Sequence, residues 1–184
     1  GIVELDGAGP IMISALTTST TTLTATFSED INGGTVNGTG SEFTVGGATV
    51  TAASKTAVGV VTLTYAPALG TGAAPLVTFT NIGTFTDLNG VEAPTPQSKT
   101  AVDGVAPTIV SITSTTANGS YNEADLAVNI TITFSEAITS AGGVTVNLDT
   151  TGSCTTGALL NSATGTCDYV IADGQSSTGL NDTS

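Results

Sequence analysis

The fold is decided by Thr22-Leu23-Thr24-Ala25-Thr26-Phe27, where apolar and hydroxyl-bearing residues alternate without a break. Successive side chains of a β-strand point to opposite faces, so this stretch predicts a strand with an apolar inner face and a threonine outer face. The same alternation predicts strands at Val60 to Tyr65, Phe43 to Val45, Val77 to Phe79, Ile130 to Phe134 and Val144 to Leu148. Helical periodicity is absent, and glycine-containing turns separate the strands. The pattern predicts an all-β protein of antiparallel sheets with one solvated face.

A repeat divides the chain. Asp6-Gly7-Ala8-Gly9-Pro10 returns as Asp103-Gly104-Val105-Ala106-Pro107, and Thr26-Phe27-Ser28-Glu29 returns as Thr133-Phe134-Ser135-Glu136. The second pair is spaced more widely, which predicts an insertion around residues 118–127. One unit has about 100 residues, the size of an immunoglobulin-type sandwich. We therefore predict tandem immunoglobulin-like antiparallel β-sandwiches over residues 1–102 and 103–184. The second is expected to be incomplete, with room for only its first four or five strands.

Charge restricts the partners. Of the 184 residues 39% are hydrophobic and only 9% are charged, with 15 acidic residues, two lysines and no histidine, so the net charge is −13. A polyanion repels nucleic acid and acidic lipids, so the expected partners are cations such as Ca²⁺ or a basic protein patch. No apolar run is long enough to insert in a membrane, and no signal-peptide pattern opens the chain. Because it begins at Gly1, we expect a processed or partial piece.

The two cysteines, Cys154 and Cys167, lie close together in the sequence among small polar residues. Two short strands joined by a loop would bring them within bridging distance, and closing such a loop contributes about 3 kcal/mol. Free thiols and a metal site are the alternatives, although no histidine or further cysteine could complete a metal site. The favoured interpretation is a hairpin disulfide, which implies an oxidising, extracellular compartment.

Three motifs resemble the immunoglobulin-like repeats of prokaryotic S-layer proteins: the Asp-Gly-x-x-Pro linker, the strand ending Phe-Ser-Glu, and Asp87-Leu88-Asn89-Gly90. The first copy, with Ser41 to Val45, is most similar to the repeats of archaeal S-layers. The second, with Asn118 to Tyr121 and Ala172-Asp173-Gly174, resembles repeats of large bacterial and archaeal surface proteins and adhesins. The resemblance implies extracellular scaffolding, often with bound calcium and glycans. It specifies a fold more firmly than a function.

Acidic residues are predicted to gather at the ends of the sandwiches. In a seven-strand sandwich the second strand and the loop before the last strand both return to the pole where the linker enters. Carboxylates meeting there would suit Ca²⁺, which prefers oxygen ligands. The candidate ligands are Asp6, Glu29, Asp30 and Asp87 in the first copy and Asp103, Glu136 and, from the insertion, Asp125 in the second. The alternative is that they are solvated loop carboxylates, since no loop has EF-hand spacing.

Four sequons are candidate glycosylation sites: Asn37, Asn118, Asn129 and Asn181. A threonine-rich chain also produces such triplets by chance. Asn37 and Asn118 lie in glycine-containing turns and are the better candidates in a secreted protein, whereas Asn129 begins a strand.

The sequence contains few of the residue types that catalyse reactions, so no enzymatic activity is expected. The chain has no histidine base, no arginine and no nucleophile elbow. Paired carboxylates could cleave glycosides, but there is no tryptophan to form a sugar platform and the phenylalanines fall on core-facing positions. A Lys–Asn isopeptide bond would need a buried lysine, and Lys55 and Lys99 both sit among polar residues.

The leading hypothesis is a structural cell-surface protein, an S-layer subunit or fragment that assembles with copies of itself into a calcium-stabilised, anionic lattice. The alternative is an adhesin stalk or an extracellular filament subunit built from the same repeats. In a filament a neighbour's strand could complete the second sandwich.

Overall fold

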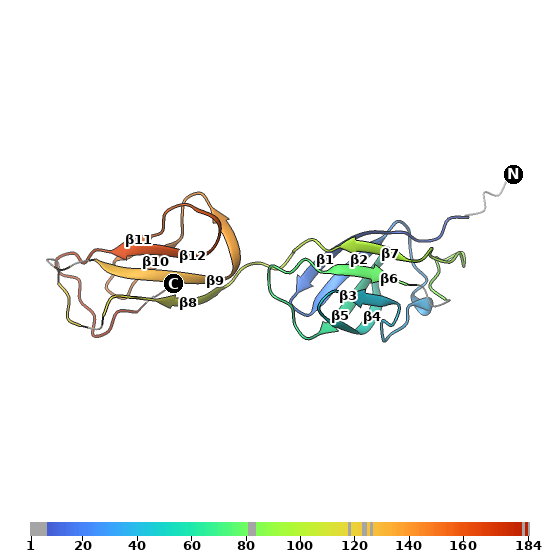
Figure 1. The fold of residues 1–184 in the computed structure, drawn as a ribbon, viewed down its shortest axis with the longest axis horizontal. Coiled ribbons are helices and arrows are strands. Elements are labelled where there is room, and N and C mark those ends of the chain that lie inside the picture. The colour runs from blue at the N-terminus through green and yellow to red at the C-terminus, as the bar shows by residue number, and fades with distance from the viewer. Residues whose placement is uncertain are drawn as a thin grey trace. The chain divides into compact units, whose positions relative to one another are not determined.

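The computed structural model describes residues 7–80, 84–117, 119–122, 125, 127–181 and 183. The chain divides into two compact units, Gly1–Ala106 and Pro107–Ser184. Each is built of antiparallel β-sheets, and no α-helix occurs among the described residues (Figure 1). The all-β prediction is therefore confirmed.

The first unit is a seven-strand sandwich. Its strands are β1 (Met12–Ser19), β2 (Thr22–Phe27), β3 (Phe43–Val45), β4 (Thr49–Ala57), β5 (Val60–Ala66), β6 (Leu76–Phe79) and β7 (Gln97–Thr100), with one 3-10 turn, η1 (Gly33–Thr35). One sheet has the order β1-β2-β5-β4 and the other has the order β3-β6-β7. These are the ABED and CFG sheets of a constant-type immunoglobulin sandwich.

The predicted alternation places the core. On β2, Leu23 and Ala25 are fully buried and are paired across the ladder with Leu63 and Val61 of β5. Directly opposed residues point to the same face of a sheet, so the two strands present one continuous apolar surface. The threonines between them lie on the outer face. The inner faces of the two sheets enclose the core of the unit.

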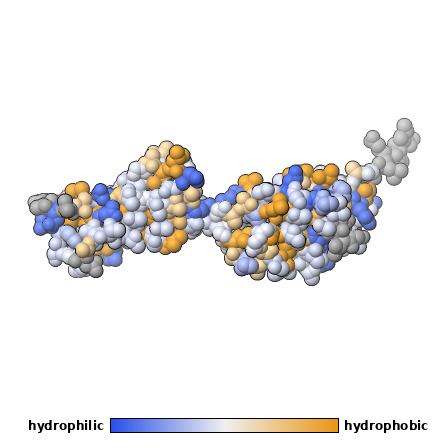
Figure 2. Space-filling model, in the orientation of Figure 1, coloured by the Kyte–Doolittle hydropathy of each residue, from blue (hydrophilic) through white to orange (hydrophobic). Residues whose placement is uncertain are grey.

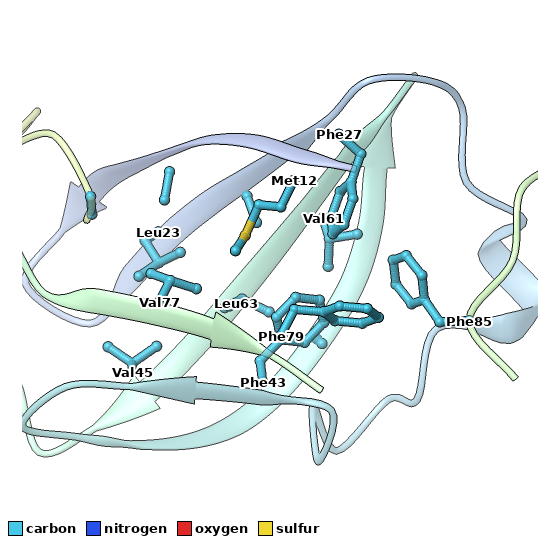
Figure 3. Close-up of a cluster of buried hydrophobic side chains, with 14 of the residues drawn as sticks. Met12, Leu23, Phe27, Phe43, Val45, Val61, Leu63, Val77, Phe79 and Phe85 are labelled. Atoms are coloured by element: carbon cyan, nitrogen blue, oxygen red, sulfur yellow. The ribbon is translucent and has the colours of Figure 1, made fainter. Parts of the chain in front are cut away.

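Aromatic rings fill one end of this core. Phe27, Phe43, Phe79 and Phe85 form a cluster with ring centroids 4.7 to 6.5 Å apart, mostly edge-on or tilted. Figure 3 shows these rings together on one side and smaller side chains, including Leu23 and Val77, on the other. Phe85 belongs to the segment between β6 and β7, so its ring ties that segment to both sheets.

The first unit extends past the predicted domain boundary. The sequence predicted that Asp103 opens the second domain, but the division falls after Ala106. Backbone hydrogen bonds join Val102 to β1, from the Thr17 N–H to the Val102 carbonyl (3.0 Å) and from the Val102 N–H to the Ala15 carbonyl (2.9 Å). The Gly104 N–H then donates to the Thr17 hydroxyl (3.0 Å). The linker motif is therefore held by the preceding sandwich.

The second unit repeats part of this plan. Its strands are β8 (Ile109–Thr113), β9 (Val128–Ser140), β10 (Thr145–Asn147), β11 (Ser153–Thr155) and β12 (Leu159–Tyr169). The sheet β12-β9-β8 has the order of β5-β2-β1 in the first unit, and β10 pairs with β11 in a second, small sheet. Among its described residues, β11 is the only named strand that pairs with β10.

Alternation again places the core of the second unit. Val128, Ile130, Ile132 and Phe134 of β9 are buried and pack with Val146, Leu148 and Tyr169.

Figure 2 shows hydrophobic and hydrophilic residues interspersed over the visible face of each unit, with large pale areas of near-neutral residues. Among the described residues, no helix has the length and apolarity needed to cross a membrane.

Candidate functional site

Asp30, one of the predicted metal ligands, has a carboxylate that contacts three other residues. One of its carboxylate oxygens lies 2.6 Å from the Lys55 ammonium group and accepts hydrogen bonds from the backbone N–H groups of Ile31 (2.9 Å) and Gly59 (3.0 Å). The hydrogen bond from Lys55, together with that from Gly59, lowers the pKa of this carboxyl below its ordinary value of 3.8. Asp30 therefore ties the end of β2 to the β4–β5 hairpin.

Asp87 lies near Asp30, as the topology predicted. Ile31 and Asp87 form an isolated antiparallel bridge, and the Asn32 N–H donates to the Thr86 carbonyl (2.9 Å). The Asp87 side chain is 1% exposed, and its Oδ1 accepts the N–H groups of Asn89 (2.8 Å) and Val91 (2.7 Å). This carboxylate thus shapes the turn that follows it.

The second oxygen of Asp87 is unusual. Oδ2 is buried and has no hydrogen-bond partner in the part of the chain that the structure describes. Leaving a carboxylate oxygen desolvated without a partner costs stability, commonly about 1–3 kcal/mol or more for a charged group. Such an oxygen is available to a cation that reaches it.

Glu42 has the same property and was missed by the sequence analysis. It is 3% exposed, and its Oε1 accepts the Asn37 N–H (2.7 Å). Its Oε2 is buried and has no hydrogen-bond partner within the described ranges. In the sequence it precedes the strand residue Phe43 and looks like an ordinary surface position. Only its contact with the preceding loop, which folds back over it, makes it a buried acceptor.

The remaining predicted ligands are Asp6, Glu29, Asp103, Glu136 and Asp125. Asp6 lies outside the described residues, and Glu29 is half-buried at the end of β2. Asp103 belongs to the first unit, where its Oδ1 accepts the Val105 N–H (3.0 Å) and the Thr17 hydroxyl (3.4 Å). Glu136 lies in β9 of the second unit, and Asp125 is exposed there and bonded to Asn122. Among the described residues, no three acidic, histidine or cysteine side chains are grouped as a metal site. Calcium binding stays a prediction.

The structure contains the Cys154–Cys167 disulfide, but not across a hairpin ladder. The Cα atoms are 5.8 Å apart, and both side chains are buried. Cys154 lies on β11, which pairs with β10, whereas Cys167 lies on β12, which pairs with β9. The bond therefore joins the two sheets of the second unit through its core.

The sequons differ in their surroundings, with Asn118 outside the described residues. Asn37 and Asn181 are exposed, whereas Asn129 is half-buried in β9 and its amide donates to Asp168 of β12 (3.2 Å). The Asn181 backbone N–H donates to Asp149 (3.2 Å). Hydrogen bonds from Ser177 and from Asn181 lower the pKa of the Asp149 carboxyl.

A surface pocket of about 290 Å³ lies in the second unit. Its polar lining includes the Tyr169 hydroxyl, which is hydrogen-bonded to Thr150 (2.8 Å) and Gln175 (2.6 Å). Hydroxyl, amide and apolar groups make up the lining, and among the described residues that line it none is acidic or basic.

Among solved structures, the chain is similar to the N-terminal part of the bacterial S-layer protein SbsC. The TM-score is 0.43 at 18% sequence identity, and the match covers 90% of this chain but only 38% of that one. A likeness at this level carries no argument about function. No protein-family model and no curated protein matches the chain.

Proposed function

We propose that the chain is part of an extracellular structural protein, an S-layer subunit whose β-sandwich units build a surface lattice. The observation that carries the proposal is the buried disulfide between the sheets of a small sandwich, because such bonds persist in oxidising compartments outside the cytosol. The tandem of sandwich units and the threonine-rich outer faces of their strands also suit a structural role better than a catalytic one.

Charge supports a role for cations in assembly. The net charge is −13, and one of the two lysines, Lys55, is already paired with Asp30. Copies of such a polyanion repel one another at low ionic strength, so close packing in a lattice requires counter-charges between them. Ca²⁺ is the cation that we propose, because carboxylate and carbonyl oxygens are its preferred ligands.

The buried oxygens of the first unit support this finer proposal. Asp87 Oδ2 is a desolvated acceptor with no hydrogen-bond partner among the described residues, at the end of the unit where Asp30 also lies. The proposed ligands remain Asp6, Glu29, Asp30, Asp87 and Asp103, all of the first unit, and Glu136 of the second. Backbone carbonyls would have to supply further oxygens.

Electron microscopy of the native assembly, with calcium and after chelation with EDTA, tests the proposal as a whole. Ordered two-dimensional sheets that dissolve on chelation are the expected result. Sheets that persist in EDTA would support the lattice proposal and contradict a role for calcium in its assembly. Fibres or isolated rods would reject the lattice in favour of a filament or an adhesin stalk.

Thermal unfolding in Ca²⁺, Mg²⁺ and EDTA tests the metal separately. We expect Ca²⁺ to raise the unfolding temperature of the first unit, and Asp87→Asn to abolish that rise. Asp173→Asn is the matched control, since it removes the same charge from an exposed loop of the second unit. Equal calcium shifts in the two variants would show that calcium acts by screening alone.

A further inference from the structure

The three sequons whose asparagines are described present their amides very differently. N-glycosylation needs a transferase to reach the asparagine Nδ2 while it also contacts the hydroxyl two residues further on. In a folded protein the triplet must therefore be exposed and free of sheet pairing. This requirement distinguishes Asn37, Asn129 and Asn181.

Asn37 meets the requirement. It lies between η1, the single turn drawn in blue in Figure 1, and β3, and all three residues of its sequon are exposed. Its Oδ1 accepts the backbone N–H (3.0 Å) and the hydroxyl (2.9 Å) of Thr39, so the amide and the hydroxyl lie side by side. One Nδ2 hydrogen donates to the exposed Ser41 hydroxyl (2.8 Å). An amide nitrogen has two hydrogens, so replacing the other leaves this bond possible.

The loop that carries Asn37 is held from below. Its backbone N–H donates to the buried Glu42, and its carbonyl accepts the Gly40 N–H (2.8 Å). Gly40 has φ +68°, and a Cβ there would lie 2.4 Å from a Val50 methyl group, so the tight turn requires glycine. The base of the loop is thus fixed against β4 while the sequon faces outward. A glycan added there displaces nothing from the core.

Asn129 does not meet the requirement. It lies within β9, paired in the ladder with Asp168, to which its Nδ2 donates. Its Oδ1 accepts from Thr115 (3.3 Å) and lies 3.5 Å from the Thr131 hydroxyl of its own sequon. A transferase would have to open the β9–β12 ladder to bind this triplet.

Asn181 is exposed but already engaged. Its Nδ2 donates to Asp149 (3.4 Å) and to the Gly179 carbonyl, and its own carbonyl accepts the Asp149 N–H (3.0 Å). Further along the triplet, the Thr183 N–H donates to the Asn147 carbonyl (2.9 Å). Binding to an enzyme would break these bonds.

We propose that Asn37 is an N-glycosylation acceptor and that Asn129 and Asn181 stay unmodified. This inference rests on the extracellular location in the proposed function. The donor is a lipid-linked diphospho-sugar: the bond from the anomeric carbon to the phosphate oxygen breaks, and the lipid diphosphate leaves with the electron pair. The anomeric carbon bonds to Nδ2, which loses one proton. No oxidation or reduction takes place.

Mass spectrometry of the native protein tests the assignment after cleavage with a glutamate-specific protease. The sequence provides the peptide Asp30–Glu42 with Asn37, the peptide 124–136 with Asn129, and the stretch 137–184 with Asn181. We expect Asp30–Glu42 to carry a glycan mass and the other two to have their unmodified masses. An unmodified Asp30–Glu42 peptide, or a glycan on either of the others, would overturn the assignment.

Two variants expressed in the native host sharpen the test. Thr39→Ala should lose the glycan, whereas Thr39→Ser retains the hydroxyl and should retain the glycan. Thermal unfolding of both variants checks that the substitution at this exposed position leaves the fold intact. A glycan that survives Thr39→Ala would overturn the sequon chemistry. The extracellular location in the proposed function is tested separately by labelling Lys99 on intact cells with a membrane-impermeant amine reagent. A labelled protein without glycan overturns the inference alone, and an unlabelled protein without glycan overturns both.

Discussion

Removing the Asp87 carboxylate should destabilise the first unit selectively. In Asp87→Ala the N–H groups of Asn89 and Val91 lose the oxygen that they share at 2.8 and 2.7 Å. Each hydrogen bond to a charged group contributes about 1.5–3 kcal/mol. Relief of the partnerless Oδ2 and access of water to the vacated turn offset part of the loss. We therefore expect a net cost of about 2–3 kcal/mol, and a rise of roughly 100-fold in the unfolded fraction of this unit.

Hydrogen exchange read by mass spectrometry measures this effect, because it reports the two units separately. Peptides from β2 and β5 should exchange roughly 100-fold faster in EDTA, while peptides from β9 should be unchanged. Asp173→Ala is the control: it removes one charge from an exposed position, where substitutions usually change stability by less than about 0.5 kcal/mol. The reasoning is refuted if both variants exchange at the same rate in the first unit.

The remaining predictions concern the core, the disulfide and the ion pair. Phe79→Ala should cost the first unit about 3–5 kcal/mol in urea unfolding, because the ring is fully buried among three others. The control Thr78→Ala should cost less than about 1 kcal/mol, and equal costs for the two variants would contradict the packing. Cys154→Ser should lower the stability of the second unit alone by about 3 kcal/mol, given the separation of 13 residues, and calorimetry with and without reductant on the native protein should reproduce that shift. Because the pKa of Asp30 is lowered in the folded state, its pairing with Lys55 stabilises the fold above about pH 4 and is lost as the pH falls through the lowered pKa. Asp30→Asn should therefore be less stable than the native chain near neutral pH, and the difference should shrink as the pH falls through the lowered pKa of Asp30. A constant difference across acid titrations would rule this out.

The central strands β2 and β5 could be predicted from the sequence, whereas the edge strands β4 and β7 could not. β2 and β5 have neighbours on both sides and one face on the core, so their apolar residues alternate strictly. β4 and β7 lie at sheet edges and are mostly exposed, and Gln97 to Thr100 contains no apolar residue at all. An edge strand is held by its neighbour's backbone, which leaves little trace in its side chains.

The candidate sites divide in the same way. The sequence brought Asp87 and Asp30 to one end of the first unit, because strand direction alone determines where a loop returns. It did not reveal that Lys55 pairs with Asp30, because these residues lie far apart in the chain. Nor did it reveal that Glu42 is buried, because its burial depends on how the preceding loop folds back.

By itself the sequence determined the all-β class, the two copies and the anionic surface, because alternation, repetition and charge can be counted along the chain. The tertiary structure decided that β2 pairs with β5 rather than β3, that Asp103 belongs to the first unit, and that Cys154 and Cys167 join two sheets. The physical reason is that side-chain alternation has a period of two residues and specifies only which face is buried. Strand partners depend on packing between segments that lie far apart in the sequence.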